Sequence, residues 1–148
     1  MTNFTKFRRE GLLCPGARLP DRVPELMLMD LRASERCATL VAPDGRVVML
    51  SAGSMRAMDI GDPAEIAGRP WWEFWPEQER PALQIAFDMT LHGEAASFRT
   101  VWETGSGRRH TWHMTLRPVI GGTGGIVKIL AISVPVDAED FPARRPRG

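Results

Sequence analysis

Histidines and a nearby carboxylate are the residues of this chain whose types and spacing could support acid–base or metal chemistry. His110 and His113 lie three residues apart in a stretch that alternates like a strand. Side chains three apart on a strand point to opposite faces, so these two cannot chelate one metal ion. His110 could form a general acid–base pair with Glu103 if the two come within hydrogen-bond reach. That pair would suit a small α+β cone enzyme, which we keep as an alternative function.

The two cysteines predict ordinary free thiols. Cys14 and Cys37 are too few for a disulfide framework, and neither belongs to a Cys-x-x-Cys pair. A free cysteine commonly packs as a small hydrophobic residue. We therefore assign no catalytic or metal-binding role to either thiol.

Composition argues against several classes of protein. The length of 148 residues suits one domain with its own core. The formal net charge of +1 gives no electrostatic basis for binding nucleic acid or a membrane, and we interpret Arg144, Arg145 and Arg147 as part of a solvated tail. No apolar run approaches the about 20 residues of a membrane span, and residues 1–9 do not lead into the apolar core of a secretory signal. We expect a cytoplasmic protein.

One aromatic stretch organises the elements that must position these residues. Residues 68–76 hold three of the five tryptophans, open with a glycine and contain two prolines. Glycine and proline punctuate local structure, which predicts a rigid, irregular connector rather than a long helix. A large aromatic side chain buries roughly 150–250 Å², so these rings should pack against a sheet. They either fill a solid core, which we favour, or form one wall of an internal pocket.

The N-terminal half predicts an arm, a helix and a hairpin. Residues 1–23 contain glycines and prolines with little periodicity, as is typical of an irregular arm. Residues 24–36 are amphipathic and predict a helix that begins at a proline. Residues 38–42 and 47–50 predict two strands joined by the turn Pro43-Asp44-Gly45. The polar and glycine-rich stretch that follows predicts two short helices.

The C-terminal half predicts one longer helix and three strands. Pro81 fits the first turn of a helix that begins near Arg80 and ends at Gly93. Alternation predicts strands over residues 97–104 and 108–119, joined by a turn at residues 105–107. A glycine-rich loop then leads to residues 126–134, which are almost continuously apolar and predict a central strand covered on both faces. Residues 137–148 predict a flexible tail.

The order and spacing of these elements resemble the PAS domain family. Asp44-Gly45 followed by Val47 resembles its first hairpin, and Gly68 followed by residues 71–77 and Arg80 resembles its helical connector. The other matching pieces are Leu91-His92-Gly93-Glu94 before Phe98, Gly107 with Trp112 and Arg117-Pro118-Val119, and Gly125 before Ile129-Leu130-Ala131-Ile132. The resemblance covers residues 38–134.

The resemblance implies an α+β PAS fold. We expect a five-stranded antiparallel sheet with short helices and one longer connector helix on one face, and the N-terminal amphipathic helix on the other. The domain would span residues 24–136. The resemblance also implies a sensory or interaction domain of bacterial-type signal transduction, such as a two-component system, rather than an enzyme. It implies a homodimer and a signalling partner protein such as a kinase or regulator.

Two departures from the family pattern concern how a signal would leave the domain. The asparagine common after the second strand is replaced by Ser51 or its neighbours, and the closing Asp-Ile-Thr reads Val134-Pro135-Val136. We expect no kinase or other output domain to follow. We therefore expect output through a partner or through self-association.

The resemblance also sets expectations for cofactors. Flavin-binding relatives of the light-sensing branch carry a reactive cysteine on the helix after the second strand, where this chain has none. Haem-binding relatives place an axial histidine on the long helix, where this chain has only His92 at the very end. We expect His92 to be a solvent-facing cap that complements the helix dipole. Neither a flavin–cysteinyl adduct nor haem is expected, and a haem-binding sensor remains an alternative.

A small apolar or aromatic ligand is the remaining expectation. Its pocket would lie between sheet and helices, where methionine adapts well to irregular shapes. The side chains expected to line it are Met55, Met58, Ile60, Trp72, Trp75, Phe87, Leu91, Phe98, Trp102, Trp112 and Met114. The alternative, which we favour slightly, is that the same side chains form a solid core.

Overall fold

The computed structural model of the chain describes residues 20–58, 60–103 and 109–136. The side chains of residues 102, 103, 109 and 110 lie outside this description. The predicted turn at residues 105–107, most of the predicted arm and the predicted tail therefore also lie outside the described residues.

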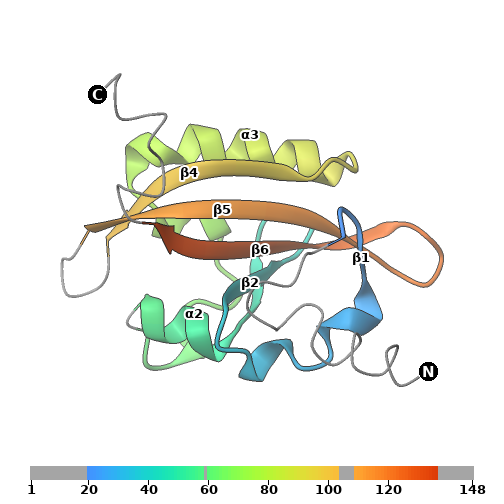
Figure 1. Cartoon of the computed structure of the whole chain (residues 1–148), viewed down its shortest axis with the longest axis horizontal. Helices are drawn as coiled ribbons and strands as arrows, with labels where there is room; N and C mark the ends of the chain where they lie inside the picture. Colours follow the sequence, from blue (N-terminus) through green and yellow to red (C-terminus); the bar gives the residue numbers. More distant parts are fainter. Residues whose placement is uncertain (1–19, 59, 104–108, 137–148) are drawn as a thin grey trace.

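A mixed sheet forms the body of the domain (Figure 1). Its strands are β1 (Val23–Pro24), β2 (Cys37–Val41), β3 (Val47–Leu50), β4 (Ala96–Glu103), β5 (Arg109–Ile120) and β6 (Ile126–Val136). The order is β3-β2-β6-β5, and both β4 and β1 pair with the far side of β5. Every pairing is antiparallel except that of β1 with β5.

Helices and short 3₁₀ turns connect the strands. The α-helices are α2 (Ala52–Ala57) and α3 (Arg80–Leu91). The 3₁₀ turns are η1 (Glu25–Leu28), η2 (Leu31–Ala33), η3 (Pro63–Glu65), η4 (Trp71–Phe74) and η5 (Glu77–Glu79). Pro81 lies in the first turn of α3, and Gly93 follows its end with a φ of 101° that favours glycine. These bounds confirm the predicted start and end of the longer helix.

Two hydrophobic clusters cover the two faces of the sheet, and β6 contributes to both. Ile129 and Ala131 belong to the cluster under α3 and the tryptophan connector, whereas Leu130 and Ile132 belong to the cluster under η1 and η2. All four are nearly inaccessible to solvent. The prediction of a central strand covered on both faces is therefore confirmed, and Figure 1 shows β6 between β5 and β2.

The predicted amphipathic helix over residues 24–36 is wrong in its secondary structure but correct in its position. The segment forms η1 and η2, with Asp30 between them outside helical geometry. Met27 and Leu31 are buried against the sheet, so the segment covers the expected face. Apolar residues also occur on its solvent side, at Leu26 and Met29. A segment with apolar residues on both sides does not define the single apolar face of an amphipathic α-helix. Its secondary structure is therefore set by how it packs on the sheet.

The sheet has six strands rather than the predicted five. The additional strand is β1, which pairs in parallel with Val119 and Ile120 of β5. Val23, which the sequence placed in the arm, is completely buried. Two residues are too few to produce a periodic pattern, so only the partner strand reveals this element.

The junction between β3 and α2 is held by one buried hydroxyl. Ser51 Oγ accepts hydrogen bonds from the backbone N–H groups of Ala38 and Ser54 and donates to the Arg36 carbonyl. The bond to Ser54 is the N-cap of α2. Gly53 follows in the first turn and donates its N–H to the Ser34 carbonyl. The start of α2 is thus fastened to the chain that leads into β2.

Replacement of Gly53 by alanine should destabilise the domain strongly. A Cβ at this position would overlap the backbone carbonyl of Glu35, which cannot move without disturbing β2. Overpacking against side chains costs about 1–3 kcal/mol, so we expect a loss of at least about 3 kcal/mol for Gly53→Ala. Urea denaturation followed by circular dichroism measures this loss.

The matched control is Gly61→Ala, because a Cβ at Gly61 meets no atom within 4 Å. Its free energy of unfolding should change by less than about 1 kcal/mol. Equal stability of the two variants would contradict the close approach at Gly53.

Candidate functional site

An internal cavity lies between the sheet and the tryptophan connector. Its volume is about 20 Å³, measured as space open to the centre of a water-sized sphere. Its lining residues are Cys37, Thr39, Ser54, Met58, Trp71, Trp75, Trp112, Met114, Ala131 and Ser133. A cavity needs about 10–15 Å³ by this kind of measure to hold one water molecule. The space present is therefore water-sized.

The strand register builds the floor of this cavity from small and polar side chains. Cys37 pairs with Ser133 across β2 and β6, and Ser133 pairs with Met114 across β6 and β5. Thr39 pairs with Ala131 one step further along the same face. Because alternate residues of a strand share a face, these side chains all point toward the connector.

Hydroxyl groups on this floor bond to sulfur atoms. Ser54 Oγ donates to Met58 Sδ at 3.4 Å and lies 3.4 Å from Thr39 Oγ1. Ser133 Oγ donates to Met114 Sδ at 3.2 Å. A thioether is a weak acceptor. Ser54 is fully buried and Ser133 half-buried, so both donors would gain from an oxygen acceptor placed in the cavity.

The opposite wall consists of aromatic rings from the connector. The rings of Trp71 and Trp75 meet edge to face at 6.4 Å between centroids. Phe87 of α3 contacts both Trp71 and Trp72, with centroids 6.2 and 5.8 Å apart. Such pairs contribute about 0.5–1.5 kcal/mol beyond the burial of their surface. The connector is thus fixed to α3 as well as to the sheet.

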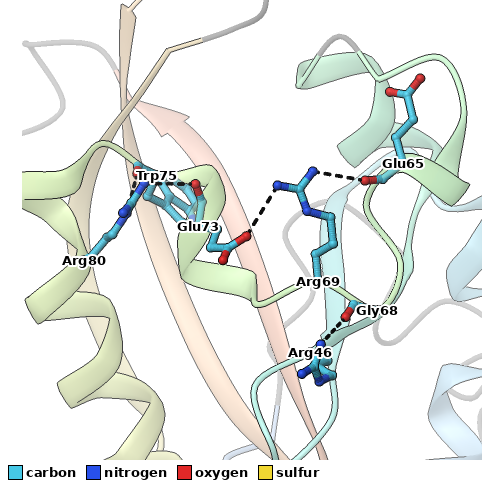
Figure 2. A network of polar contacts seen from close by, with 7 residues as sticks. All are labelled: Arg46, Glu65, Gly68, Arg69, Glu73, Trp75 and Arg80. Carbon is cyan, nitrogen blue, oxygen red and sulfur yellow. Dashed lines mark hydrogen bonds and ion pairs between the residues drawn. The ribbon is translucent and has the colours of Figure 1, made fainter.

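Three arginines fasten the outer side of the connector (Figure 2). Arg46 donates to the Gly68 carbonyl, and Arg69 lies 3.4 Å from the carboxylate of Glu73. Arg80 donates to the carbonyls of Glu73 and Trp75. Arg46 and Arg80 thereby satisfy backbone carbonyls in a segment whose short 3₁₀ turns leave several without helical partners.

The structure brings four of the eleven predicted lining residues to the cavity: Met58, Trp75, Trp112 and Met114. Six others belong to the same hydrophobic cluster without lining it: Met55, Ile60, Trp72, Phe87, Leu91 and Phe98. The side chain of Trp102 lies outside the described part of the chain. Most of the predicted aromatic set therefore serves as packed core.

Sequence reasoning missed the polar floor and Trp71. The sequence does hold a partial signal for the floor. Cys37, Thr39 and Val41 are alternate residues of a stretch of apolar or small side chains, so in a strand they share one face. What the sequence does not show is which residue of β6 faces them. That depends on a register between residues almost a hundred positions apart.

Of the histidine and carboxylate candidates, the side chains of His110 and Glu103 lie outside the described part of the chain. His92 is an exposed cap of α3 whose Nδ1 lies 2.8 Å from the Asp88 carbonyl oxygen, as predicted for a cap. In the β4–β5 register His110 lies opposite Trp102, whereas Glu103 lies opposite Arg109. Across the described ranges, no three His, Cys, Asp or Glu side chains gather as a metal-binding group. No helix in those ranges is both long and apolar enough to cross a membrane.

Burial raises the pKa of the Cys37 thiol above its ordinary value, and hydrogen bonds with Ser54 and Ser133 lower it by less. The thiol is therefore protonated at neutral pH. A buried protonated thiol is unreactive, because the thiolate is the nucleophile. Cys37 acts here as a weak hydrogen-bond donor in the cavity floor, with its sulfur 3.6 Å from Ser54 Oγ.

Comparison with known proteins places this geometry in a family. The sequence profile of a family described as PAS fold matches residues 31–140. No curated protein matches the chain.

Solved structures share the fold at low sequence identity. A light-oxygen-voltage domain studied with a flavin analogue matches with a TM-score of 0.61 and 16% identity, covering 76% of this chain and 85% of that one. The PAS domain of an HTR-like protein from Haloarcula marismortui matches at 0.59 and 20%, covering 72% and 85%. The PAS-B domain of Drosophila melanogaster Cycle, with bound ethylene glycol, matches at 0.58 and 14%, covering 68% and 99%.

The raised pKa of Cys37 predicts how its contribution to stability changes with pH. The unfolded chain loses the thiol proton first as the pH rises, so the contribution is complete below the unfolded pKa and is lost above it. The stability advantage of the wild type over Cys37→Ala should shrink between about pH 7 and about pH 10. Urea denaturation of both proteins under reducing conditions measures this. An advantage that stays constant over the range would contradict a buried, protonated Cys37.

Proposed function

The chain belongs to the PAS fold family, and from this premise we propose that it is a sensory domain whose stimulus is a small molecule in the internal cavity. The observation that carries this proposal is the cavity lining. Hydroxyl groups of Thr39, Ser54 and Ser133 face one side and tryptophan rings face the other. Such a mixture suits a small aromatic or apolar ligand that carries one oxygen acceptor.

The size of the cavity suggests how such a ligand would generate a signal. Ligand pockets usually measure about 300–1,000 Å³, well above the volume of about 20 Å³ found here. A ligand larger than water must therefore displace part of the wall. The connector consists of short turns, and besides its packed rings and surface arginines it is joined to residues 45–47 by one β-bridge rather than by a full strand ladder. We infer that ligand binding shifts this connector and selects a second conformation of the domain.

Flavin and haem are not part of this proposal. Helix α2 contains no cysteine that could form a flavin adduct. The nearest described thiol, Cys37, lies on β2 with its pKa raised by burial. The histidine near the long helix, His92, is an exposed cap rather than a residue directed into the core.

Output through self-association is the second part of the proposal. Leu26 and Met29 are apolar residues of the N-terminal segment that remain 70% and 69% exposed. They lie beside Met27, which is buried in the domain's own core. The segment thus presents apolar side chains outward while covering the sheet. We propose that it forms the homodimer contact, and that a partner such as a kinase or regulator responds to the dimer.

A panel of small aromatic carbonyl and hydroxyl compounds tests the sensory proposal. An absorbance spectrum and a native mass spectrum of freshly purified protein should come first, because they detect a ligand that is already bound. We then expect at least one compound to raise the melting temperature of the wild type. The variant Ala131→Val, which adds methyl groups at the cavity lining, should bind it at least about tenfold more weakly, which corresponds to about 1.4 kcal/mol.

The matched control for the cavity is Ala96→Val, since Ala96 packs against the same cluster without lining the cavity. This variant should bind the compound as the wild type does. Equal binding by all three proteins would place the ligand elsewhere and contradict the proposal, as would a panel in which no compound binds.

Charged substitutions test the dimer contact. Because Leu26 and Met29 are exposed, Leu26→Glu and Met29→Glu should leave the fold intact and shift the protein from dimer to monomer in sedimentation or light scattering. Ile85→Glu is the matched control, because Ile85 of α3 is similarly exposed at 64%. It should remain dimeric. A dimer that survives both N-terminal substitutions would refute this contact.

A further inference from the structure

A second hollow lies on the outer side of β3 and shares no lining residue with the internal cavity. It is an open groove with a volume of about 380 Å³. Its lining residues are Arg32, Val48, Met49, Leu50, Ala52, Met55, Pro63, Ala64 and Ala67. Its volume falls within the usual range of about 300–1,000 Å³ for small-molecule sites.

Four elements build this groove. Residues 48–50 of β3 contribute one wall, and β3 is an edge strand that pairs with β2 alone among the described strands. Helix α2 contributes Ala52 and Met55. The segment around η3 contributes Pro63, Ala64 and Ala67. Arg32 comes from η2, which contacts α2. Figure 1 shows α2 beside the N-terminal turns.

The chemistry of the lining is strongly asymmetric. Eight of the nine residues are apolar, and the ninth is an arginine. Val48 is 42% exposed, so part of the apolar surface remains in contact with water. Exposed apolar surface of this kind, gathered in a concave site, commonly marks a binding surface.

Arg32 is the only charged side chain of the lining, and it forms no hydrogen bond or ion pair with any described residue. A neighbouring arginine differs in this respect: Arg56, on the same helix as Met55, forms an ion pair with Glu35. A free guanidinium carries five N–H donors in a fork that matches a carboxylate with two parallel bonds. The groove therefore offers one anion-binding group at the border of an apolar surface.

We propose that this groove binds a small amphipathic carboxylate. The apolar body of the ligand lies against Met55, Leu50 and Ala64, and its carboxylate pairs with Arg32. Burial of the body supplies most of the affinity at about 25 cal/mol per Å², and the arginine fixes the orientation. This site is distinct from the proposed sensory cavity, although adjacent residues of α2, Ser54 and Met55, contribute to the two.

An NMR titration of the full chain tests the proposal with decanoate, used below its micellar concentration and at low ionic strength. Amide shifts should be concentrated at residues 48–50, Ala64 and Ala67. Decyltrimethylammonium, which has the same apolar chain and the opposite charge, should bind at least about fivefold more weakly. The internal cavity residues Ala131 and Ser133 should be unaffected, which separates this result from that of the sensory proposal.

Two exposed positions supply the variants. Arg32→Gln should weaken decanoate binding about fivefold to tenfold, and Ala67→Phe should weaken it further by filling the groove. Arg56→Gln is the matched control, because Arg56 is close by but does not line the groove. It should bind decanoate within about twofold of the wild type.

Three outcomes would overturn the proposal. One is equal binding of the cationic and anionic probes, which would remove the role of Arg32. Another is a decanoate response confined to Ala131 and Ser133, which would place the ligand in the internal cavity. The last is a concentration-dependent shift at residues 48–50 without any ligand, which would make a second copy of the chain the occupant of the groove.

Discussion

The hydroxyl of Ser51 is the interaction on which the geometry of the cavity depends. It is fully buried and serves three backbone groups, from Arg36, Ala38 and Ser54. Each buried group left without a partner would cost about 1–3 kcal/mol. Through these bonds one side chain fixes where β2 begins and where α2 starts.

The position of α2 then decides what faces the cavity. Because α2 starts where Ser51 places it, Ser54 reaches over β2 to within 3.4 Å of Thr39 Oγ1. The pairing of β2 with β6 brings Cys37 and Ser133 to the same floor. The tryptophan connector closes the space from the other side, held by rings on the inside and arginines on the outside. The cavity is thus the space that remains between α2, the paired strands β2 and β6, and the tryptophan connector.

Local signals predicted the parts of this fold that local chemistry determines. The turn at Pro43-Asp44-Gly45 needs a glycine at positive φ, and α3 has Pro81 in its first turn and Gly93 just after its end for reasons visible in the sequence. The alternating strand predicted over residues 108–119 is present as β5, with Trp112 and Met114 on its core face. What the sequence could not determine depends on distant pairing. The strand at Val23, the floor at Ser133 and the groove at Arg32 each exist only because segments far apart in the chain come together.

The tryptophans of this domain have an optical consequence. Three of them, Trp71, Trp75 and Trp112, surround one cavity and are almost fully buried. Indole emission depends on the polarity around the ring, and the protein contains no tyrosine that would add to the signal. The intrinsic fluorescence of the chain is therefore weighted toward this cavity, which three of its five tryptophans line. An event that wets or fills this space changes the colour and yield of that emission without any added label.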